Sequence, residues 1–309
     1  MASERNQTII LSQEDYTKYT HLLNPSPQVN SVIHGDCLEK IKLIPSGSID
    51  LVVTDPPYNL TKLYSETLFN ATSSNEYNKW FEEWIVEIKR VLTSEGTLYL
   101  FNDWRAADII NILRKYFYVQ NRITFEREKG RGAKKNWKNA HEDIWFCTMH
   151  SSKYYFDIEK VKVKKNVIAP YKKDGKAKDW NEEDSTRLTY PSNFWGDITI
   201  PFWSMPENTP HPTQKPEKLI AKLILASSKE NDVVLDIFGG SGTTAVVAKK
   251  LNRKFIIIES EKEYCLYTLK RLDMAELNKK IQGYDGHVFL DRNFNNISKS
   301  EGSKAKKLL

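Results

Sequence analysis

Cysteine is scarce in this sequence, and long apolar runs are missing from it. Only three of the 309 residues are cysteine, at Cys37, Cys147 and Cys265, and none forms a Cys-x-x-Cys pair. An odd number of widely separated cysteines predicts neither a disulfide framework nor a zinc site. No apolar run approaches the roughly 20 residues that a membrane-spanning helix needs, and the first six residues are polar. We therefore expect a soluble protein of the reducing cytoplasm, without a membrane partner.

The composition is that of a folded chain. Hydrophobic residues make up 40% of the sequence and aromatic residues 12%, which excludes an intrinsically disordered protein. A length of 309 residues fits one large domain, or one domain with a sizeable insertion. Buried apolar strands that alternate with helical patterns predict an α/β fold.

Positive charge is concentrated in one middle segment. The net charge is +6, yet residues 122–178 hold 16 Lys/Arg against 7 Asp/Glu, which leaves 30 against 33 for the rest. Glycines and aromatic side chains, such as Trp137, are interleaved with this charge. Flexible basic loops beside stacking side chains suit a polyanion with exposed bases, and a solvated surface is the alternative. We expect nucleic-acid contacts here, from Lys129, Arg131, Lys134, Lys135 and Lys138.

The first informative motif is the tetrapeptide Asp55-Pro56-Pro57-Tyr58, which follows the apolar run 49–53. This run is short, β-branched and stopped by two prolines, so we expect a buried parallel strand that ends at Asp55. Ligands bind outside the carboxyl ends of such strands. Asp55 and the Pro56 carbonyl are two acceptors for an exocyclic amino group, and the Tyr58 ring can stack on its heterocycle. The alternative is a plain turn with a packing tyrosine.

A second motif lies far downstream. An apolar strand that includes Asp236 ends in the glycine turn Phe238-Gly239-Gly240-Ser241-Gly242-Thr243, a helix follows, and the next strand ends at Glu259. Glycines let the backbone approach a ligand, and the acid can bind a ribose. The motif predicts a nucleoside-containing cofactor. Because it also satisfies G-x-G-x-x-A, an NAD-dependent oxidoreductase is an alternative, whereas a P-loop matches poorly because the Lys-Ser/Thr is absent.

Two further features accompany these motifs. The proline-bounded segment 210–216 predicts a rigid loop that presents hydroxyl and ammonium donors, from Thr213 and Lys215, to an anionic group. Its His211 has no second ligand at metal-binding spacing, so we expect no metal site. Asp36 follows an expected strand at residues 29–34 and suits either a helix cap or a ligand contact.

Between the motifs, the α/β alternation continues and is then interrupted. Helical spacing predicts a helix around residues 80–92, whose tryptophans we assign to the core, and strands are expected at 97–101, 118–125 and 144–148. The last two have no helix between them, which indicates an antiparallel pair. Residues 154–203 are basic and turn-rich, and we interpret them as an inserted element of short strands and loops. Residues 61–75 show no period and suit a mobile lid.

Together, the tetrapeptide and the Asp-x-Phe-x-Gly-x-Gly pattern of the glycine turn resemble motifs of the S-adenosylmethionine-dependent amino-group DNA methyltransferases. These are bacterial enzymes that usually belong to restriction-modification systems. The order of the motifs, with His-Pro-Thr-Gln-Lys-Pro between the basic region and the glycine turn, is similar to that of the circularly permuted beta group. The resemblance spans about residues 29–272. It implies one Rossmann-like domain with a seven-stranded, mostly parallel sheet and an inserted target-recognition region.

The resemblance also implies boundaries and roles. The expected parts are an N-terminal arm (1–28), a catalytic half (29–150), the inserted region (151–205), a cofactor half (206–277) and a C-terminal tail (278–309). Asp55 and the Pro56 carbonyl would bind the target amino group and Tyr58 would stack on the flipped base. The residues expected to contact or orient the cofactor are Asp36, Asp55, His211, Thr213, Lys215, Asp236, Phe238, Gly239, Gly240, Ser241, Gly242, Thr243 and Glu259.

The expected reaction is methylation of adenine N6 in DNA, and methylation of cytosine N4 is the alternative because it uses the same acceptors. Asp at the first motif position favours adenine within this family. Attack through carbon 5 of cytosine is disfavoured, because neither Cys37 nor Cys147 follows a proline. The family resemblance further leaves room for a homodimer, and for a cognate restriction endonuclease that acts on the same site.

Overall fold

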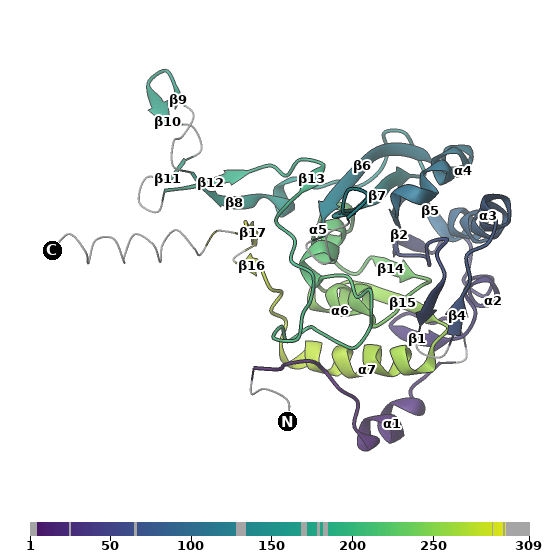
Figure 1. Ribbon diagram of the computed structural model, residues 1–309. Helices are drawn as coiled ribbons and strands as arrows, with labels where there is room; N and C mark the ends of the chain where they lie inside the picture. Colours follow the sequence, from purple (N-terminus) through teal and green to yellow (C-terminus); the bar gives the residue numbers. More distant parts are fainter. Residues whose placement is uncertain are drawn as a thin grey trace.

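The computed structural model describes most of the chain, and Figure 1 shows how its elements are arranged. The described residues are 5–24, 26–64, 67–127, 134–167, 172–177, 180–181, 185–285, 287–292 and 294. An eight-stranded sheet runs through this part of the molecule. In spatial order its strands are β1 (Ser31–His34), β15 (Lys254–Glu259), β14 (Val233–Asp236), β2 (Ile49–Thr54), β5 (Leu92–Asn102), β7 (His141–Thr148), β6 (Tyr118–Glu126) and β13 (Phe194–Trp195).

Most neighbours in this sheet are parallel. The first five strands run in one direction, β7 is antiparallel to both β5 and β6, and β13 is parallel to β6. The pairing of β6 with β7 confirms the antiparallel pair expected at 118–125 and 144–148. Antiparallel strands need no crossover helix, which is why none lies between them. The sheet has eight strands where seven were expected, and the additional strand, β13, contains only two residues.

Helices cover both faces of the sheet (Figure 1). On one face lie α5 (Glu217–Ser227), α6 (Thr243–Lys250) and α7 (Lys262–Leu277). On the other face lie α2 (Cys37–Ile41), α3 (Ser74–Val91), the 3₁₀ helix η1 (Trp104–Ile109) and α4 (Ile110–Tyr116). The strands between them are buried and rich in Val, Ile and Leu, as parallel strands covered on both faces are. Trp84 of α3 is fully buried, so its helical spacing correctly predicted a core position.

A second, five-stranded sheet lies beside the first. Its order is β11 (Trp180–Asn181), β12 (Thr186–Thr189), β8 (Val163–Asn166), β17 (Val288–Leu290) and β16 (Tyr284–Asp285). The first three strands belong to the inserted region, which also contains the 3₁₀ helix η2 (Glu159–Val161) and the hairpin of β9 (Lys172–Lys173) and β10 (Lys176–Ala177). The last two come from the segment after α7. Phe289 of this segment is fully buried and belongs to the large apolar cluster of the main sheet, so β17 connects the second sheet to that core.

The N-terminal segment also packs on the main domain. Helix α1 (Gln13–Thr20) begins at a capping box formed by Ser12 and Asp15. Helix α1 lies beside α7 (Figure 1). Its Tyr19, together with Ile9 and Leu11, packs in a small apolar cluster with residues of α7. In the stretch 61–75, strands β3 (Lys62–Tyr64) and β4 (Thr67–Phe69) pair as a hairpin. Among the described residues no helix is both long enough and apolar enough to span a membrane.

Candidate active site

Asp55, the first residue of the tetrapeptide, and the glycine turn border one pocket. They follow β2 and β14, which are adjacent parallel strands with Leu51 beside Val234. The carboxyl ends of both strands therefore open at the same edge of the sheet. The pocket is lined by Val53, Asp55, Phe101, His211, Thr213, Gln214, Lys215, Ile220, Asp236, Phe238, Gly239, Gly240, Ser241, Thr243 and Thr244. Residues almost 200 positions apart in the sequence thus face the same small space.

Asp236 joins the two strand ends. One carboxylate oxygen accepts hydrogen bonds from Thr54 Oγ1 at 2.9 Å and from the Phe238 backbone N–H at 3.1 Å. The other accepts from Thr244 Oγ1 at 2.8 Å. Burial raises the pKa of Asp236 to about 7, although these three bonds oppose the rise. Asp236 therefore orients both the strand before the tetrapeptide and the glycine turn, as expected of a residue that positions the turn.

Glycines are required where the turn meets its neighbours. A Cβ at Gly239 would lie 2.2 Å from Ile257 Cγ2, and one at Gly242 would lie 2.3 Å from Thr268 Cγ2. Gly240 and Gly242 also have φ of 51° and 77°, values that L side chains rarely adopt. The turn is thus pressed against β15 and α7, its backbone lines the pocket, and it leads into the N-terminus of α6, which favours a negatively charged group.

Aromatic packing fixes the first residue of the turn. The Phe238 ring centroid lies 5.3 Å from that of Trp84 and 5.8 Å from that of Trp80. Both tryptophans belong to α3, on the opposite face of the sheet from α6. The core tryptophans thus support the glycine turn, a connection that their helical spacing did not predict.

Glu259 and Asp36 stand at the ends of the neighbouring strands β15 and β1. Glu259 is buried, and it accepts the Gly240 backbone N–H at 2.7 Å and the Glu261 N–H at 2.8 Å. Burial raises the pKa of Glu259, and these backbone bonds offset only part of the rise. The Asp36 carboxylate caps α2 through the N–H groups of Leu38 and Glu39. Neither acid lines the pocket that contains Asp55.

The tetrapeptide is held by tyrosines at both ends. Tyr58 Oη donates to Asp55 Oδ1 at 2.7 Å, and Tyr77 Oη of α3 donates to the Pro57 carbonyl at 3.1 Å. Burial raises the pKa of Asp55, and Lys215 only partly counters it. Burial and the nearby Asp55 carboxylate raise the pKa of Tyr58 well above its usual value. Tyr58 therefore stays a neutral hydrogen-bond donor.

Lys215 reaches the tetrapeptide from the loop before α5. Its ammonium contacts Asp55 Oδ2 and lies 3.2 Å from Glu142 Oε2. Glu142 is 4% exposed, and its other carboxylate oxygen is 2.7 Å from Arg127 Nη1. Glu142 and Arg127 lie on β7 and just after β6. Neither residue could be identified from the sequence, because pairs brought together by antiparallel strands have no spacing signature.

His211 and Thr213 lie with Lys215 along the pocket. The His211 ring packs edge-on against Tyr264 of α7, with centroids 4.5 Å apart, and a Cβ at Gly240 would approach His211 Nε2 to 2.8 Å. The three members of this loop that were expected at the cofactor are thus beside the glycine turn. Within the described part of the chain, no cluster of His, Cys, Asp and Glu could hold a metal ion.

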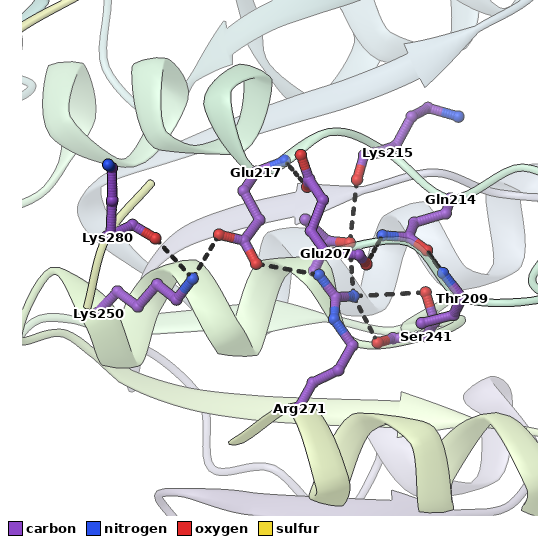
Figure 2. A network of polar contacts seen from close by, with 10 residues as sticks. Glu207, Thr209, Gln214, Lys215, Glu217, Ser241, Lys250, Arg271 and Lys280 are labelled. Carbon is purple, nitrogen blue, oxygen red and sulfur yellow. Dashed lines mark hydrogen bonds and ion pairs between the residues drawn. The ribbon is translucent and has the colours of Figure 1, made fainter. Parts of the chain in front are cut away.

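A buried polar network supports the glycine turn from behind (Figure 2). Arg271 of α7 donates to the Ser241 carbonyl at 2.8 Å and to Thr243 Oγ1 at 3.0 Å, and it pairs with Glu217 Oε1 at 3.2 Å. The second Glu217 oxygen is 2.6 Å from Lys250 Nζ. The sequence analysis did not identify Arg271, since a lone arginine in a helix carries no motif.

The basic residues expected to contact DNA are only partly described. Lys129 and Arg131 lie outside the described residues. Lys134, Lys135 and Lys138 are exposed in the segment before β7, and the Trp137 side chain between them is 93% exposed. Asn139 Nδ2 in the same segment donates to Asp103 Oδ2 at 3.2 Å. This bond links the basic segment to the carboxyl end of β5, at the edge of the sheet where the pocket opens.

Comparison with known sequences identifies relatives of this chain. A family model described as DNA methylase matches residues 49–270. The chain is 35% identical over 255 residues to the DNA adenine methyltransferase YhdJ of Escherichia coli, covering 80% of this chain and 84% of that protein. It is 36% identical over 250 residues to the type II methyltransferase M.HpaI of Haemophilus parainfluenzae, covering 80% and 75% of the two chains.

Solved structures resemble the fold. The M1.HpyAVI–SAM complex matches with a TM-score of 0.55 and 25% identity, over 78% of this chain and 98% of the other. The cytosine-N4-specific PvuII DNA methyltransferase matches with a TM-score of 0.59 and 21% identity, over 87% of this chain and 96% of the other. The second likeness concerns the fold alone.

Proposed function

This chain belongs to the DNA methylase family, and from that membership we propose that it transfers a methyl group from S-adenosylmethionine to the N6 amino group of adenine in DNA. One observation carries the proposal. Asp55 and the glycine turn line the same pocket, so a base amine held by one and a methyl donor held by the other would meet. The enzyme is thus a DNA methyltransferase whose two substrates bind at adjacent strand ends.

The pocket fits the proposed cofactor. The glycine turn brings bare backbone and the N-terminus of α6 to the pocket wall, and Thr213 adds a hydroxyl group. These groups suit the charged methionine end of the cofactor. Glu259, which braces Gly240, suits the ribose, and Asp36 beyond it suits the adenine end. Asp236 would act by orienting the turn and not by direct contact.

The tetrapeptide suits the target base. Asp55 and the Pro56 carbonyl would accept the two hydrogens of the exocyclic amine, which aims the nitrogen lone pair, and the Tyr58 ring would stack on the base. Bound S-adenosylmethionine would supply an activated methyl group: the electrons of the broken carbon–sulfur bond would stay on sulfur, and the methylated amine would lose one proton to water. Asp55 would offset the positive charge that develops on the nitrogen. Alignment of this kind lowers barriers by up to about 7–11 kcal/mol.

Adenine is the proposed base, and cytosine N4 is the second candidate. A relative with 35% identity is named an adenine methyltransferase, and Asp in the first tetrapeptide position favours the same base. Cytosine N4 remains the second candidate because both amines would use the same two acceptors.

We infer that DNA contacts lie on the basic segment and on the inserted region. Lys134, Lys135 and Lys138 would contact phosphates, and the short strands of residues 151–205 would read the sequence in a groove. The remaining expectations are the division of the domain into two halves, the bacterial cytoplasm, a homodimer and a cognate endonuclease. The last is supported by the type II methyltransferases among the relatives.

The proposal is tested by incubating the protein with unmethylated genomic DNA and methyl-labelled S-adenosylmethionine, and then identifying the labelled nucleoside by mass spectrometry. Labelled N6-methyladenine is expected. Labelled N4-methylcytosine would show that cytosine is the target base. The absence of any labelled nucleoside would contradict both candidate activities.

A binding experiment separates the other functional classes. S-adenosylmethionine should raise the melting temperature of the protein, while NAD should leave it unchanged. Stabilisation by NAD alone would favour the oxidoreductase reading of the G-x-G-x-x-A pattern. Stabilisation by neither compound would favour a DNA-binding protein without catalytic activity.

A further inference from the structure

The backbone of Lys215 is held beside the glycine turn, and its ammonium lies at the other end of the pocket, beside Asp55. Its backbone carbonyl accepts a hydrogen bond from Thr243 Oγ1 at 3.0 Å, while its side chain points away from the network behind the turn (Figure 2). The side chain is 10% exposed, and its ammonium lies between Asp55 and Glu142. It also lies 5.1 Å from the centroid of the Phe101 ring. The ammonium therefore belongs to the base-binding end of the pocket.

This position conflicts with binding of the target amine. Tyr58 donates to one oxygen of Asp55 and Lys215 to the other. The amine would need the same carboxylate as an acceptor. Moreover, the amine nitrogen becomes positively charged during transfer, and an ammonium on the same carboxylate would oppose that charge. With Lys215 on Asp55, the carboxylate is occupied by an internal substitute for the base amine.

Glu142 offers the ammonium a second position. Its Oε2 is already 3.2 Å from Lys215 Nζ, and its Oε1 is paired with Arg127. Arg127 is in turn held by its backbone N–H, which donates to the Ala140 carbonyl at 2.7 Å. A buried ammonium that lost its only carboxylate would be strongly disfavoured. The Lys215 ammonium can leave Asp55 and remain in an ion pair, because the Glu142 carboxylate is fixed and within reach.

We propose that Lys215 is a positioning residue that occupies the amine position on Asp55 in the free enzyme and is held by Glu142 when the base enters. The proposal rests on the proposed function and deepens it. Lys215 keeps Asp55 ionised and oriented before the base arrives, and Glu142 then removes the competing charge. This role differs from the contact with the cofactor carboxylate that the family resemblance implies for Lys215.

The test uses Glu142→Gln, Lys215→Met and the double variant, with Lys249→Met as the control. Lys249 pairs with Glu276 on the surface, outside the pocket. The dissociation constant for S-adenosylmethionine is measured by calorimetry. The KM for unmethylated genomic DNA and the single-turnover rate are measured with a labelled methyl group. Glu142→Gln keeps the size of the side chain, and Lys215→Gln replaces Lys215→Met if the latter does not fold.

We expect each single variant to slow the single-turnover step at least tenfold while cofactor affinity stays within threefold of the wild type. In Glu142→Gln the ammonium has no second carboxylate and stays on Asp55. In Lys215→Met, Asp55 faces Glu142 with no cation between them. The double variant removes both problems, so it should be no slower than the slower single variant.

Three results would overturn the proposal. The two penalties could multiply in the double variant, Glu142→Gln could retain wild-type rate, or Lys215→Met could lose tenfold or more in cofactor affinity. The last would return Lys215 to the cofactor carboxylate. If the wild type transferred no methyl group to DNA, both the proposed function and this inference would be wrong. If the wild type is active and the rate losses of the two single variants multiply in the double variant, only the inference is wrong.

Discussion

The chain places buried lysines in two regions, and their surroundings differ. Lys215 lies in the pocket between Asp55 and Glu142. Lys222 of α5 lies against the second sheet, 2.7 Å from Asp197 Oδ2 and 4.8 Å from the centroid of the Trp195 ring. Lys218, also on α5, shares Asp197 at 2.8 Å and donates to the Leu290 carbonyl at 2.6 Å. Helix α5 and the loop before it therefore contact both the pocket, through Lys215, and the segment after β13, through Lys218 and Lys222.

The charge balance of the two regions is opposite. Burial would lower the pKa of Lys215, but Asp55 and Glu142 outweigh it and the pKa rises. Burial lowers the pKa of Lys222 to about 8, because Asp197 compensates only in part and Lys218 repels it. In the pocket, Asp55 and Glu142 share the Lys215 ammonium, and Arg127 also pairs with Glu142. Between α5 and the segment after β13, Lys218 and Lys222 share the carboxylate of Asp197, which ties this segment to α5.

Asp197→Ala should produce the largest effect, and it should be on stability. Two buried ammonium groups would lose their shared carboxylate, which costs about 3–5 kcal/mol when a buried pair is broken. Denaturant unfolding measures the loss, and the turnover number per folded molecule should stay near that of the wild type. A loss below about 1 kcal/mol would show that the contacts at Asp197 do not tie the segment after β13 to α5.

Asp55→Ala should give the converse result. We expect at least a hundredfold loss of methyl transfer, about 2.7 kcal/mol, because the acceptor for the amine is gone. Folding and cofactor binding should be retained, since Glu142 still pairs with Lys215. Single-turnover rates and calorimetry with S-adenosylmethionine measure the two quantities. Near-normal transfer by this variant would remove Asp55 from the mechanism.

The pKa of Lys222 predicts a smaller, pH-dependent effect. A lysine whose pKa is lower in the folded state than its ordinary value binds fewer protons there, so its contribution to stability increases as the pH rises from about 8 toward its ordinary value. The free energy of unfolding of the wild type, minus that of Lys222→Met, should therefore increase from pH 8 to pH 9.5 by at most about 2 kcal/mol. A decrease over this range would mean that Asp197 dominates the lysine's environment.

The smallest effects are expected on the surface of the basic segment. Replacing Lys134, Lys135 and Lys138 by Ala should raise the KM for DNA a few-fold per lysine and leave the single-turnover rate unchanged. The slope of log affinity against log salt should fall by roughly 0.9 for each lysine that contacts a phosphate. Filter binding at several salt concentrations measures this slope. An unchanged slope would show that these lysines form a solvated face.

Much of the pocket was predictable because its parts are local. Asp55 follows an apolar run that is stopped by prolines, and Gly239 to Gly242 follow another, so their strand-end positions could be derived from short patterns. The antiparallel pair β6 and β7 was predictable for the same reason. The class of reaction was accessible through the resemblance of both motifs to those of the amino-group DNA methyltransferases.

The rest depends on contacts between distant residues. Glu142 and Arg127 meet across antiparallel strands, and Arg271 reaches the glycine turn from a helix that ends near residue 277. None of these has a spacing that sequence reasoning can detect. Strand β13 is too short to show a pattern. Strand β17 pairs with β8, and β16 pairs with β17, although more than 100 residues separate β8 from these two strands.

The most direct test of the account is a crystal structure of the protein with DNA and an unreactive analogue of S-adenosylmethionine. The flipped base should donate its amine to Asp55 and to the Pro56 carbonyl, with the analogue on the glycine turn in the same pocket. A base held on another face, or an analogue bound away from the glycine turn, would contradict it.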